Sequence, residues 1–518
     1  MELQLSKVSI MSQEPVTSIP QTNSETANDN IASDSVEDKL GSSAHPLSTQ
    51  STSLSDNGST GFHSSSASHS KISQFFEFEQ LGTNFKTEVL AGVTTFVTMA
   101  YILAVNPDIL SNAIFLQSSG DLFGELVFAT AISSAIATLI MGLYAKYPFA
   151  LAPGMGINAY FAFSVVLGLG IEWRVALAAV FIEGLLFIAM SLTKMRSRIV
   201  SAIPDCLKHA TAAGIGLFIA YIALTSNSGI IVTSDATTTM LGSLSNANTL
   251  MAIAGILITG AFVARRIKGA LLFGILATAL LGWILGVTPW PQGLIGVPVL
   301  PVHIAGQAFV GLAQVLNTNV WELLAILFVF LFVDTFDTVG TLTGVGVKAG
   351  FVNEQGELPH ASKAFMADAI GTTAGAALGT STTTTFIESA SGVSAGGRSG
   401  FTAVVAAVLF AIAIFFTPLL SAIPPFATAP VLLIVGVLMV GSITDINWED
   451  PAESIPSFLT LLFIPLSFSI AEGLAVGFIS YPLFKTFQGK AHEIDITVWI
   501  LAAVFLLRFV FLALEIGA

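Results

Sequence analysis

The feature that most constrains this chain is a series of apolar segments, most of them about 18–22 residues long, that recurs from about residue 88 to the end. A helix of about 20 apolar residues is long enough to span a bilayer. The chain is 53% hydrophobic and only 10% charged, whereas a soluble domain is about one-quarter charged. We therefore predict an all-α polytopic membrane protein, because helices satisfy their own backbone hydrogen bonds in lipid. The alternating pattern of about ten residues that is typical of a transmembrane β-barrel is absent.

The apolar segments predict fourteen membrane spans and one further run. We place the spans at residues 88–110, 122–145, 149–168, 173–193, 209–226, 249–264, 269–287, 320–345, 365–378, 384–397, 401–422, 427–444, 456–470 and 472–486. The last run, residues 496–514, contains Arg508 and is either a fifteenth span or a helix at the membrane interface. The sequence leaves both alternatives open.

The distribution of Lys and Arg orients these spans. The stretches 111–121, 226–248 and 288–319 contain neither residue, and the basic residues lie in the stretches of opposite parity. Because cytoplasmic loops carry the excess of positive charge, we expect a multi-pass protein of the plasma (inner) membrane with a cytoplasmic N-terminus.

The N-terminal stretch differs from the rest of the chain. Residues 1–70 carry eight acidic residues and two lysines, a net charge of −6, and are rich in Ser and Thr without an apolar period. Such a composition indicates disorder. We therefore divide the chain into a disordered tail, residues 1–74, and a transmembrane domain, residues 75–518. The tail is either a regulatory or partner-binding segment or a solvated extension without an essential role.

Two predicted spans are interrupted at corresponding positions, each third in a set of seven. The first reads "FALAPGMGINAYFAF" (149–163), and the second lies in "GTSTTTTFIESASGVSAGGRSG" (379–400). Pro and Gly disfavour helix in the first, and the β-branched run Thr382–Thr385 does so in the second. Interrupted spans at matching positions in two halves are typical of an inverted-repeat transporter with its site near the membrane midplane.

Extended backbone inside a membrane survives only where protein or water satisfies its polar groups. An extended stretch that leads into a half-helix presents backbone N–H groups and a partial positive charge at the helix N-terminus. Ser and Thr hydroxyls add donors and acceptors. The polar strip at 379–400 therefore indicates one half of a binding site.

Charged residues inside the apolar spans are the next candidates, because burying one in a bilayer is costly and they are functional by default. Asp334 and Asp337 lie three residues apart in one predicted helix, Glu388 begins the second half-helix and Asn158 begins the first. We favour ligand or proton binding for Asp337, Glu388 and Asn158. The alternative for Glu388 and Asn158 is capping of the half-helices. The alternative for Asp337 is a structural carboxylate bonded to hydroxyls of the 384–397 span.

Four other polar features have structural interpretations. Packing or pairing with neighbouring helices is favoured for Asp334 and Glu183, a hairpin end for Glu472, and an anchor on the cytoplasmic side for Arg398. The stretch "GVSAG" (392–396) matches G-x-S-x-G, but neighbouring spans offer no histidine partner. A phosphate-binding G-x-x-x-x-G-K-[ST] motif is absent. We therefore expect no enzyme activity, no metal, no cofactor and no nucleic-acid partner.

Four blocks carry a family resemblance. They are "GTNFKTEVLAGVTTFVTMAYILAVNP" (82–107), "APGMGINAYF" (152–161), "FVDTFDTVGTLTGV" (332–345) and the 379–400 strip. Together they resemble the AzgA-type purine permeases, the adenine/guanine/hypoxanthine branch of the nucleobase–ascorbate transporter superfamily. The resemblance covers about residues 75–518, and Glu388 is followed by Ser389, as suits the purine branch.

The resemblance implies fourteen spans in two inverted repeats of seven, which form two parts of the transmembrane domain. The core covers about 85–200 and 320–422, and the gate covers about 205–290 and 427–518. It further implies alternating access, proton symport of purine nucleobases (guanine, hypoxanthine or adenine) and a homodimer in the lipid bilayer. The alternative is an anion transporter of the same fold, such as a sulfate permease, although acids at the site would repel an anion.

By motif position, the resemblance implies that Glu388 grips the base and that Asp337 and Asn158 belong to the site. A carboxylate can accept two parallel N–H bonds from guanine, and we expect the proton to be carried by Asp337 or Glu388. The other residues that we expect to line the site provide backbone donors or aromatic stacking: Met155, Gly156, Thr385, Ser389, Tyr101, Phe336 and Phe386.

Overall fold

The computed structural model describes residues 71–193, 202–234, 238–315, 319–351, 358–359 and 361–516. The chain divides into two compact units, Met1–Ser65 and Ser66–Ala518, and every described residue belongs to the second. The predicted disordered tail up to residue 70 lies outside the described residues.

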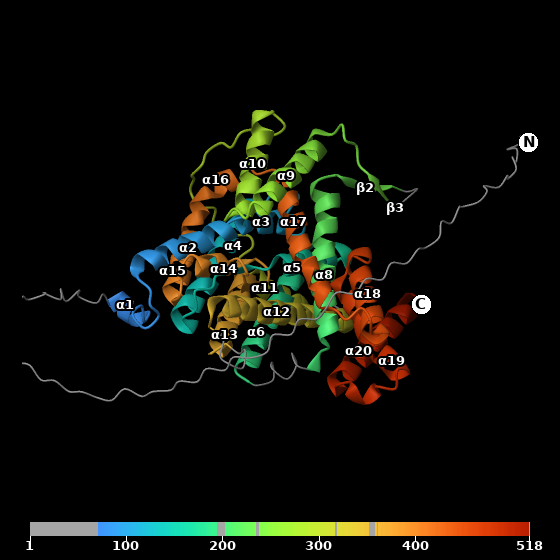
Figure 1. Cartoon of the computed structure of the whole chain (residues 1–518). Helices are drawn as coiled ribbons and strands as arrows, with labels where there is room; N and C mark the ends of the chain where they lie inside the picture. The colour runs from blue at the N-terminus through green and yellow to red at the C-terminus, as the bar shows by residue number, and fades with distance from the viewer. Residues whose placement is uncertain are drawn as a thin grey trace, which may run out of the picture. The chain divides into compact units, whose positions relative to one another are not determined.

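The first half of the described chain is almost entirely helical (Figure 1). Its elements are α1 (Lys71–Phe75), α2 (Phe85–Met99), α3 (Ile102–Ser111), α4 (Phe123–Ile140), η1 (Met141–Ala145), β1 (Leu151–Pro153), α5 (Met155–Ala159), η2 (Tyr160–Gly168), α6 (Trp173–Ser191), α8 (Asp205–Ile222), η3 (Ala223–Asn227), β2 (Ile231–Ser234), β3 (Thr238–Leu241), α9 (Ala247–Ala264) and α10 (Ala270–Ile284).

The second half repeats this character, with one short strand. Its elements are α11 (Gln307–Gln314), α12 (Val320–Ala349), α13 (Ala361–Leu378), β4 (Thr383–Thr385), α14 (Ser389–Ser394), α15 (Gly400–Ala413), η5 (Ile414–Phe416), α16 (Thr417–Leu420), α17 (Pro425–Val440), η6 (Gly441–Asp445), α18 (Pro451–Leu466), α19 (Ile470–Phe487), η7 (Ala491–Glu493) and α20 (Ile496–Ile516).

Eight helical segments among the described residues are long and apolar enough to cross a membrane, and four shorter apolar helices accompany them. The chain is therefore a multi-pass helical membrane protein. Most apolar runs of the sequence fall on one or more of these helices. The runs at 365–378 and 472–486 fall instead on α13 and α19, and the run at 384–397 falls on β4 and α14. The first run is divided at Ala100 and Tyr101 into α2 and α3, and the run at 401–422 is divided into α15, η5 and α16.

The helices pack in two groups. In one, α15 packs against α2 and α4, while α13 packs against α4 and α6. In the other, α17 packs against α8, α9 and α10, while α18 packs against α8 and α19. Elements from the two halves of the sequence are therefore neighbours within each group.

A buried carboxylate joins α2 to the segment that precedes α15. Glu88 is fully buried and accepts hydrogen bonds from the backbone N–H groups of Arg398 (2.9 Å) and Ser399 (3.2 Å). It also accepts from the hydroxyls of Thr402 (2.6 Å) and Thr83 (2.8 Å). Buried charge is tolerated when it is hydrogen-bonded in this way. Glu88 thus fixes the end of the 379–400 strip against the first span.

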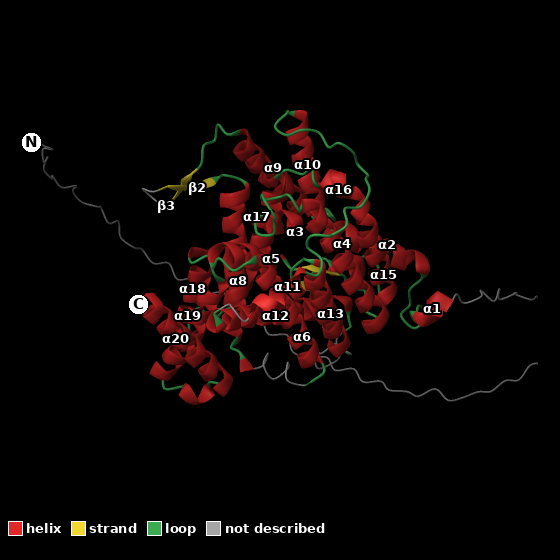
Figure 2. Ribbon diagram, turned by 180° about the vertical axis from the view of Figure 1, so that it is seen from behind, coloured by secondary structure: helices red, strands yellow, loops and turns green. Residues whose placement is uncertain are grey.

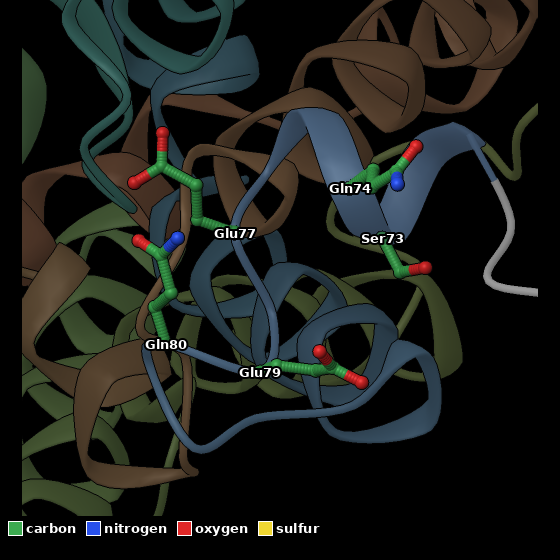
Figure 3. Close-up of a pocket in the computed structure, with 5 residues that line it drawn as sticks. All are labelled: Ser73, Gln74, Glu77, Glu79 and Gln80. Carbon is green, nitrogen blue, oxygen red and sulfur yellow. The ribbon is translucent and has the colours of Figure 1, made fainter.

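Residues 71–74, which we expected to belong to the tail, form most of α1 instead. The reason lies just after them, where Phe76 and Phe78 are buried and contact the ring of Phe401 at centroid distances of 5.3 Å and 5.8 Å. A surface hollow of about 110 Å³ lies at this turn, and Figure 3 shows its lining residues, Ser73, Gln74, Glu77, Glu79 and Gln80. Helical structure in the described part of the chain therefore starts at Lys71, four residues before the boundary that we predicted at residue 75.

The stretch between the spans at 209–226 and 249–264 contains a two-stranded hairpin that we did not predict. Strands β2 and β3 pair antiparallel, with Ile231 opposite Leu241 and Thr233 opposite Thr239. Figure 2 shows this hairpin beyond the ends of the helices around it.

Candidate functional site

The two interrupted segments meet as a pair of short antiparallel strands. Strand β1 pairs with β4 in the register Leu151 with Thr385, Ala152 with Thr384 and Pro153 with Thr383. In Figure 2 they are the short strands between the helices near α5. All six residues are buried. The expectation of extended backbone in both segments is confirmed. The strands pair along one edge, and the outer backbone groups of Leu151 and Thr383 bond to the hydroxyls of Thr138 and Thr372.

Hydrogen bonds continue on both sides of this strand pair. The N–H of Gly154 donates to the carbonyl of Thr382 (3.0 Å), and that of Phe386 donates to the carbonyl of Ala150 (3.0 Å). The Ser389 hydroxyl accepts from the N–H of Ala150 (2.9 Å). The backbone donors of Phe386 and Asn158 are therefore already engaged, the latter with the carbonyl of Gly154 (2.9 Å). Ser389 joins the two segments.

Glu388 lies immediately before α14, at the point where the extended segment becomes helical. Its side chain makes no capping hydrogen bond to its own helix, so the capping alternative is not what the structure shows. Instead Oε1 accepts a hydrogen bond of 2.7 Å from the hydroxyl of Tyr101. Glu388 is partly exposed, whereas Tyr101 is fully buried between α2 and α3. Tyr101 is thus a hydrogen-bond donor to the carboxylate, a contact that the sequence did not indicate.

Asp337 lies on α12 beside this carboxylate. It hydrogen-bonds the hydroxyl of Thr384, and it is close enough to Glu388 for the two acids to interact electrostatically. Asp337 is exposed, whereas Asp334, one turn earlier, is fully buried. The two aspartates on this helix therefore have different surroundings, and only Asp337 is accessible from outside the protein interior.

Asn158 is engaged in an internal network. Its Nδ2 donates to Oδ1 of Asn106 (2.5 Å), and its Oδ1 accepts from the hydroxyl of Ser381. Asn106 in turn donates to the hydroxyls of Thr130 (2.7 Å) and Thr380 (3.0 Å). Asn158 is fully buried. The network joins α3, α4, α5 and the segment before β4, and through it Asn158 positions the strand pair.

The other predicted lining residues fall near the strand pair in different roles. Met155 and Phe386 are buried, and Thr385 lies in β4. Phe336 is half-buried, with its ring 4.6 Å from that of Phe332 and the Lys208 ammonium 5.3 Å from its centre. A Cβ added to Gly156 would come within 2.6 Å of Cγ2 of Ile215 on α8. Gly156 therefore permits close approach of α5 and α8.

A buried group of three acids lies next to the strand pair, on α6, α12 and α13. Glu183, Asp334 and Asp368 are each fully buried. Glu183 interacts with Asp334, with Thr382 and, electrostatically, with Asp368, which accepts a hydrogen bond of 2.5 Å from the hydroxyl of Thr338. We expected only helix packing or pairing for the first two and did not select Asp368. Asp368 is the lone acid of the predicted 365–378 span, and this position could have identified it as a candidate functional residue.

Arg398 has a local partner set. Its Nη1 donates to the carbonyls of Val393 and Gly397, both at 3.1 Å. The Val393 carbonyl belongs to the last turn of α14, where a cation is favourable, and Gly397 lies just beyond that helix. In the part of the chain that the structure describes, no group of three or more His, Cys, Asp or Glu side chains is arranged to hold a metal ion.

A strand pair between two half-helices, with acids from two helices beside it, defines a membrane transport protein. Residues 86–476 match the family described as the Permease family. The chain belongs to this family.

Three relatives match this sequence over most of its length. The sequence is 53% identical to a permease of Methanocaldococcus jannaschii, over 85% of this chain and 99% of the relative. It is 45% identical to the guanine/hypoxanthine permease PbuG of Bacillus subtilis, with the same coverage. It is 38% identical to the adenine permease AdeQ of Escherichia coli, over 85% and 96%. The resemblance to the purine permeases is confirmed, and the chain is a permease rather than an enzyme.

Solved structures show a similar fold at low sequence identity. The transmembrane domain of the cyanobacterial bicarbonate transporter BicA has a TM-score of 0.52 at 17% identity and covers 76% of this chain and 97% of its own. SLC26A9 has a TM-score of 0.56 at 12% identity, with 80% and 68% coverage. At this identity the likeness concerns the fold alone.

Proposed function

We propose that this permease imports a purine nucleobase together with a proton, and that Glu388 binds the base. The observation that carries the proposal is the position of the Glu388 carboxylate at the junction of β4 and α14. There Tyr101 holds Oε1 at 2.7 Å, and the residue is accessible. Guanine and hypoxanthine are the substrates named for the relative at 45% identity, and adenine is the one named for the relative at 38%. We therefore favour guanine or hypoxanthine.

The chemistry of guanine fits this carboxylate. Its N1–H and exocyclic amino group present two parallel donors, and a carboxylate is the acceptor that can take both. Such a pair is strong when water is excluded. Oε2 of Glu388 and the second lone pair of Oε1 remain for the base while Tyr101 restrains the side chain. Phe386 and the accessible part of Phe336 are the aromatic surfaces that we assign to the ring.

Asp337 is our candidate for the coupled proton. It is exposed and interacts electrostatically with Glu388. It also hydrogen-bonds the hydroxyl of Thr384, which lies 3.0 Å from the hydroxyl of the buried Thr338. Two neighbouring carboxylates repel each other when both are ionised, so a proton binds more readily to one of them. Protonation of one acid therefore assists binding of the base to the other, which couples the two ligands.

Alternating access supplies the movement. We assign the core to residues 85–200 and 320–422 and the gate to 205–290 and 427–518, arranged as fourteen spans in two inverted repeats. The two packing groups of helices support this division. Contacts between core and gate include the hydroxyl of Thr428, which donates to Asp108 at 2.7 Å, and the rings of Phe332 and Phe478, 5.7 Å apart. A homodimer in the plasma (inner) membrane with cytoplasmic N-termini completes the proposal.

The main alternative is an anion transporter, because solved structures of similar fold include a bicarbonate transporter. The acids at the site argue against it. Glu388 and Asp337 interact with each other beside the strand pair, and their negative charge would repel an anion.

The test is uptake of radiolabelled guanine, hypoxanthine and adenine in a host that lacks its own purine permeases, with sulfate and uracil as controls. We expect saturable uptake of at least one purine, abolished by a protonophore and by Glu388→Gln at unchanged membrane abundance. Glu449→Gln, an exposed acid outside the helices, is the matched control and should leave uptake unchanged. Normal purine uptake by Glu388→Gln would reject the role of Glu388, and sulfate uptake without purine uptake would favour the anion transporter.

A further inference from the structure

An apolar cavity of about 200 Å³ lies between α12 and α20, and its lining includes neither the strand pair nor the acids beside it. Four of its lining residues come from α12 and four from α20: Trp321, Leu324, Ala325, Phe328, Leu501, Val504, Phe505 and Arg508. On each helix the residues are spaced by three, four and seven, so each set forms one helix face. Leu324 and Val504 are 50% and 42% exposed, so the cavity opens at the protein surface.

Arg508 closes this cavity with an unusual set of unsatisfied donors. The residue is only 4% exposed, although it is the only charged member of the lining. Its Nη2 forms an ion pair of 2.7 Å with Oε1 of Glu472 at the start of α19. Its Nε and Nη1 are buried and have no hydrogen-bond partner among the described residues. Nε carries one N–H and Nη1 two, so three of the five guanidinium donors lack an acceptor.

A second unsatisfied group lies near the same ion pair. The hydroxyl of Tyr160, which is 1% exposed, also lacks a hydrogen-bond partner in the described part of the chain. Tyr160 begins η2, and it is close enough to Arg508 and Glu472 to interact with both electrostatically. Buried donors without acceptors are rare in native proteins. Several buried threonine hydroxyls of the described chain also lack a partner, but Arg508 is the only cationic side chain among the atoms with this property. Because unmade hydrogen bonds cost most at a buried charge, the orphan hydroxyl beside it and its own free donors indicate a missing acceptor.

The geometry points to a binding site for one anionic phospholipid, with its phosphate at Arg508 and an acyl chain in the cavity between α12 and α20. Arginine favours phosphate oxygens as hydrogen-bond acceptors, and the N–H groups of Nε and Nη1 are the donors of Arg508 that have no partner among the described residues. The seven apolar lining residues offer nothing to a hydrated free anion, but they match a hydrocarbon chain. The cavity opens on the surface of a membrane protein, where the surrounding bilayer supplies such a molecule.

The test is native mass spectrometry of the whole purified protein, together with thermal unfolding, in the presence of phosphatidylglycerol or of phosphatidylcholine with the same acyl chains. We expect the wild-type protein to retain one phosphatidylglycerol at least tenfold more strongly than phosphatidylcholine and to unfold at a higher temperature with it. Equal retention of the two lipids would overturn the proposal.

Two variants test separately the contact of the lipid phosphate with Arg508 and the packing of the acyl chain in the cavity. The double variant Arg508→Gln/Glu472→Gln removes both charges and keeps a neutral pair, so it should lose the preference for phosphatidylglycerol. Ala325→Phe fills the cavity from α12 and leaves Arg508 intact, so it should lose retention of the lipid altogether. Val437→Phe adds the same bulk at an exposed position of α17 and should behave as the wild type. Retention of phosphatidylglycerol by both cavity variants at the wild-type level would reject the site.

Three further measurements test the role of Tyr160 and distinguish a lipid in the cavity from a free anion or a second copy of the protein. Tyr160→Phe removes only one hydroxyl and should weaken the preference for phosphatidylglycerol severalfold in a folded protein. Inorganic phosphate should not displace the lipid, and full displacement would mean a free-anion site. If Ala325→Phe converts a dimer to a monomer and phosphatidylglycerol has no effect on either, the cavity is a contact between two copies of the chain, and the lipid proposal fails.

Discussion

The hydroxyl of Tyr101 lies 2.7 Å from Oε1 of Glu388, although 287 residues separate them in sequence. Tyr101 sits at the break between α2 and α3, and Glu388 sits at the junction of β4 and α14. The hydrogen bond thus joins a helix break in the first half of the chain to a strand–helix junction in the second half. Its acceptor is the side chain that we propose binds the substrate.

Tyr101→Phe should impair transport through this contact. A hydrogen bond to a charged group is worth about 1.5–3 kcal/mol, so we expect uptake efficiency to fall about 10- to 100-fold. The measurement is the KM and maximal rate for guanine uptake at matched membrane abundance. Tyr144→Phe, which changes an exposed tyrosine, is the control. If both variants transport like the wild type, Tyr101 does not position Glu388 for the substrate.

Asp337→Asn should uncouple transport from the proton gradient. The side chain cannot exchange a proton, but the amide can still hydrogen-bond Thr384 and leaves Glu388 in place. We therefore expect exchange of labelled for unlabelled guanine to continue, while accumulation against a gradient falls to the equilibrium level. Counterflow and accumulation assays in proteoliposomes measure the two separately. Accumulation driven by an imposed pH gradient in this variant would assign the proton to another acid.

Gly156→Ala should obstruct the contact between α5 and α8. Its Cβ would approach Cγ2 of Ile215 to 2.6 Å, and β-branched side chains in helices have little freedom to move away. Overpacking of this kind costs about 1–3 kcal/mol, and we expect reduced uptake. Ile215→Ala should restore uptake in the double variant, because it removes the atom that clashes. Gly260→Ala, at a helical glycine with open space around it, should be neutral. If uptake stays low in the double variant, the methyl group at position 156 acts through a contact other than Ile215, for instance with the substrate.

Glu88→Ala should destabilise the protein. Two backbone N–H groups and two hydroxyls would lose a buried acceptor, and we expect a loss of about 3 kcal/mol or more. Thermal unfolding in detergent measures it, with Glu493→Ala, an exposed acid, for comparison. A melting temperature equal to that of the control would show that water or a neighbouring group replaces the carboxylate.

The sequence predicted the features that depend on local chemistry. The Thr382–Thr385 run and the Pro153–Gly154 pair cannot form good helix, so extended backbone at both sites followed from residue type. The register did not, because Leu151 pairs with a residue from the other half of the chain. The hairpin of β2 and β3 was missed because its residues carry no strong turn signal that we recognised.

For the site, the acids were visible but their partners were not. Glu388 and Asp337 stood out as charges in apolar segments, whereas the tyrosine that holds Glu388 looked like an aromatic for stacking. Asn158 was selected for its place at a half-helix start, and its engagement with Asn106 and Ser381 depends on packing between α3, α5 and the segment before β4. Asp368 was overlooked although it is the lone acid of the 365–378 segment, because the group of acids to which it belongs forms only when α6, α12 and α13 pack together.

The β1–β4 pair also has a consequence for biosynthesis. Strand β1 is synthesised about 230 residues before Thr385, its partner. At about 5–20 residues per second, the ribosome needs roughly 10–50 s to supply β4. During that interval the backbone of Leu151 has the hydroxyl of Thr138 as a partner. Ala152, whose partner in β4 is Thr384, has no strand to pair with, and hydrocarbon cannot satisfy its polar groups. The third segment of the nascent chain therefore has to wait in contact with water or with the insertion machinery, and its final place in the bilayer is fixed only when the second half arrives.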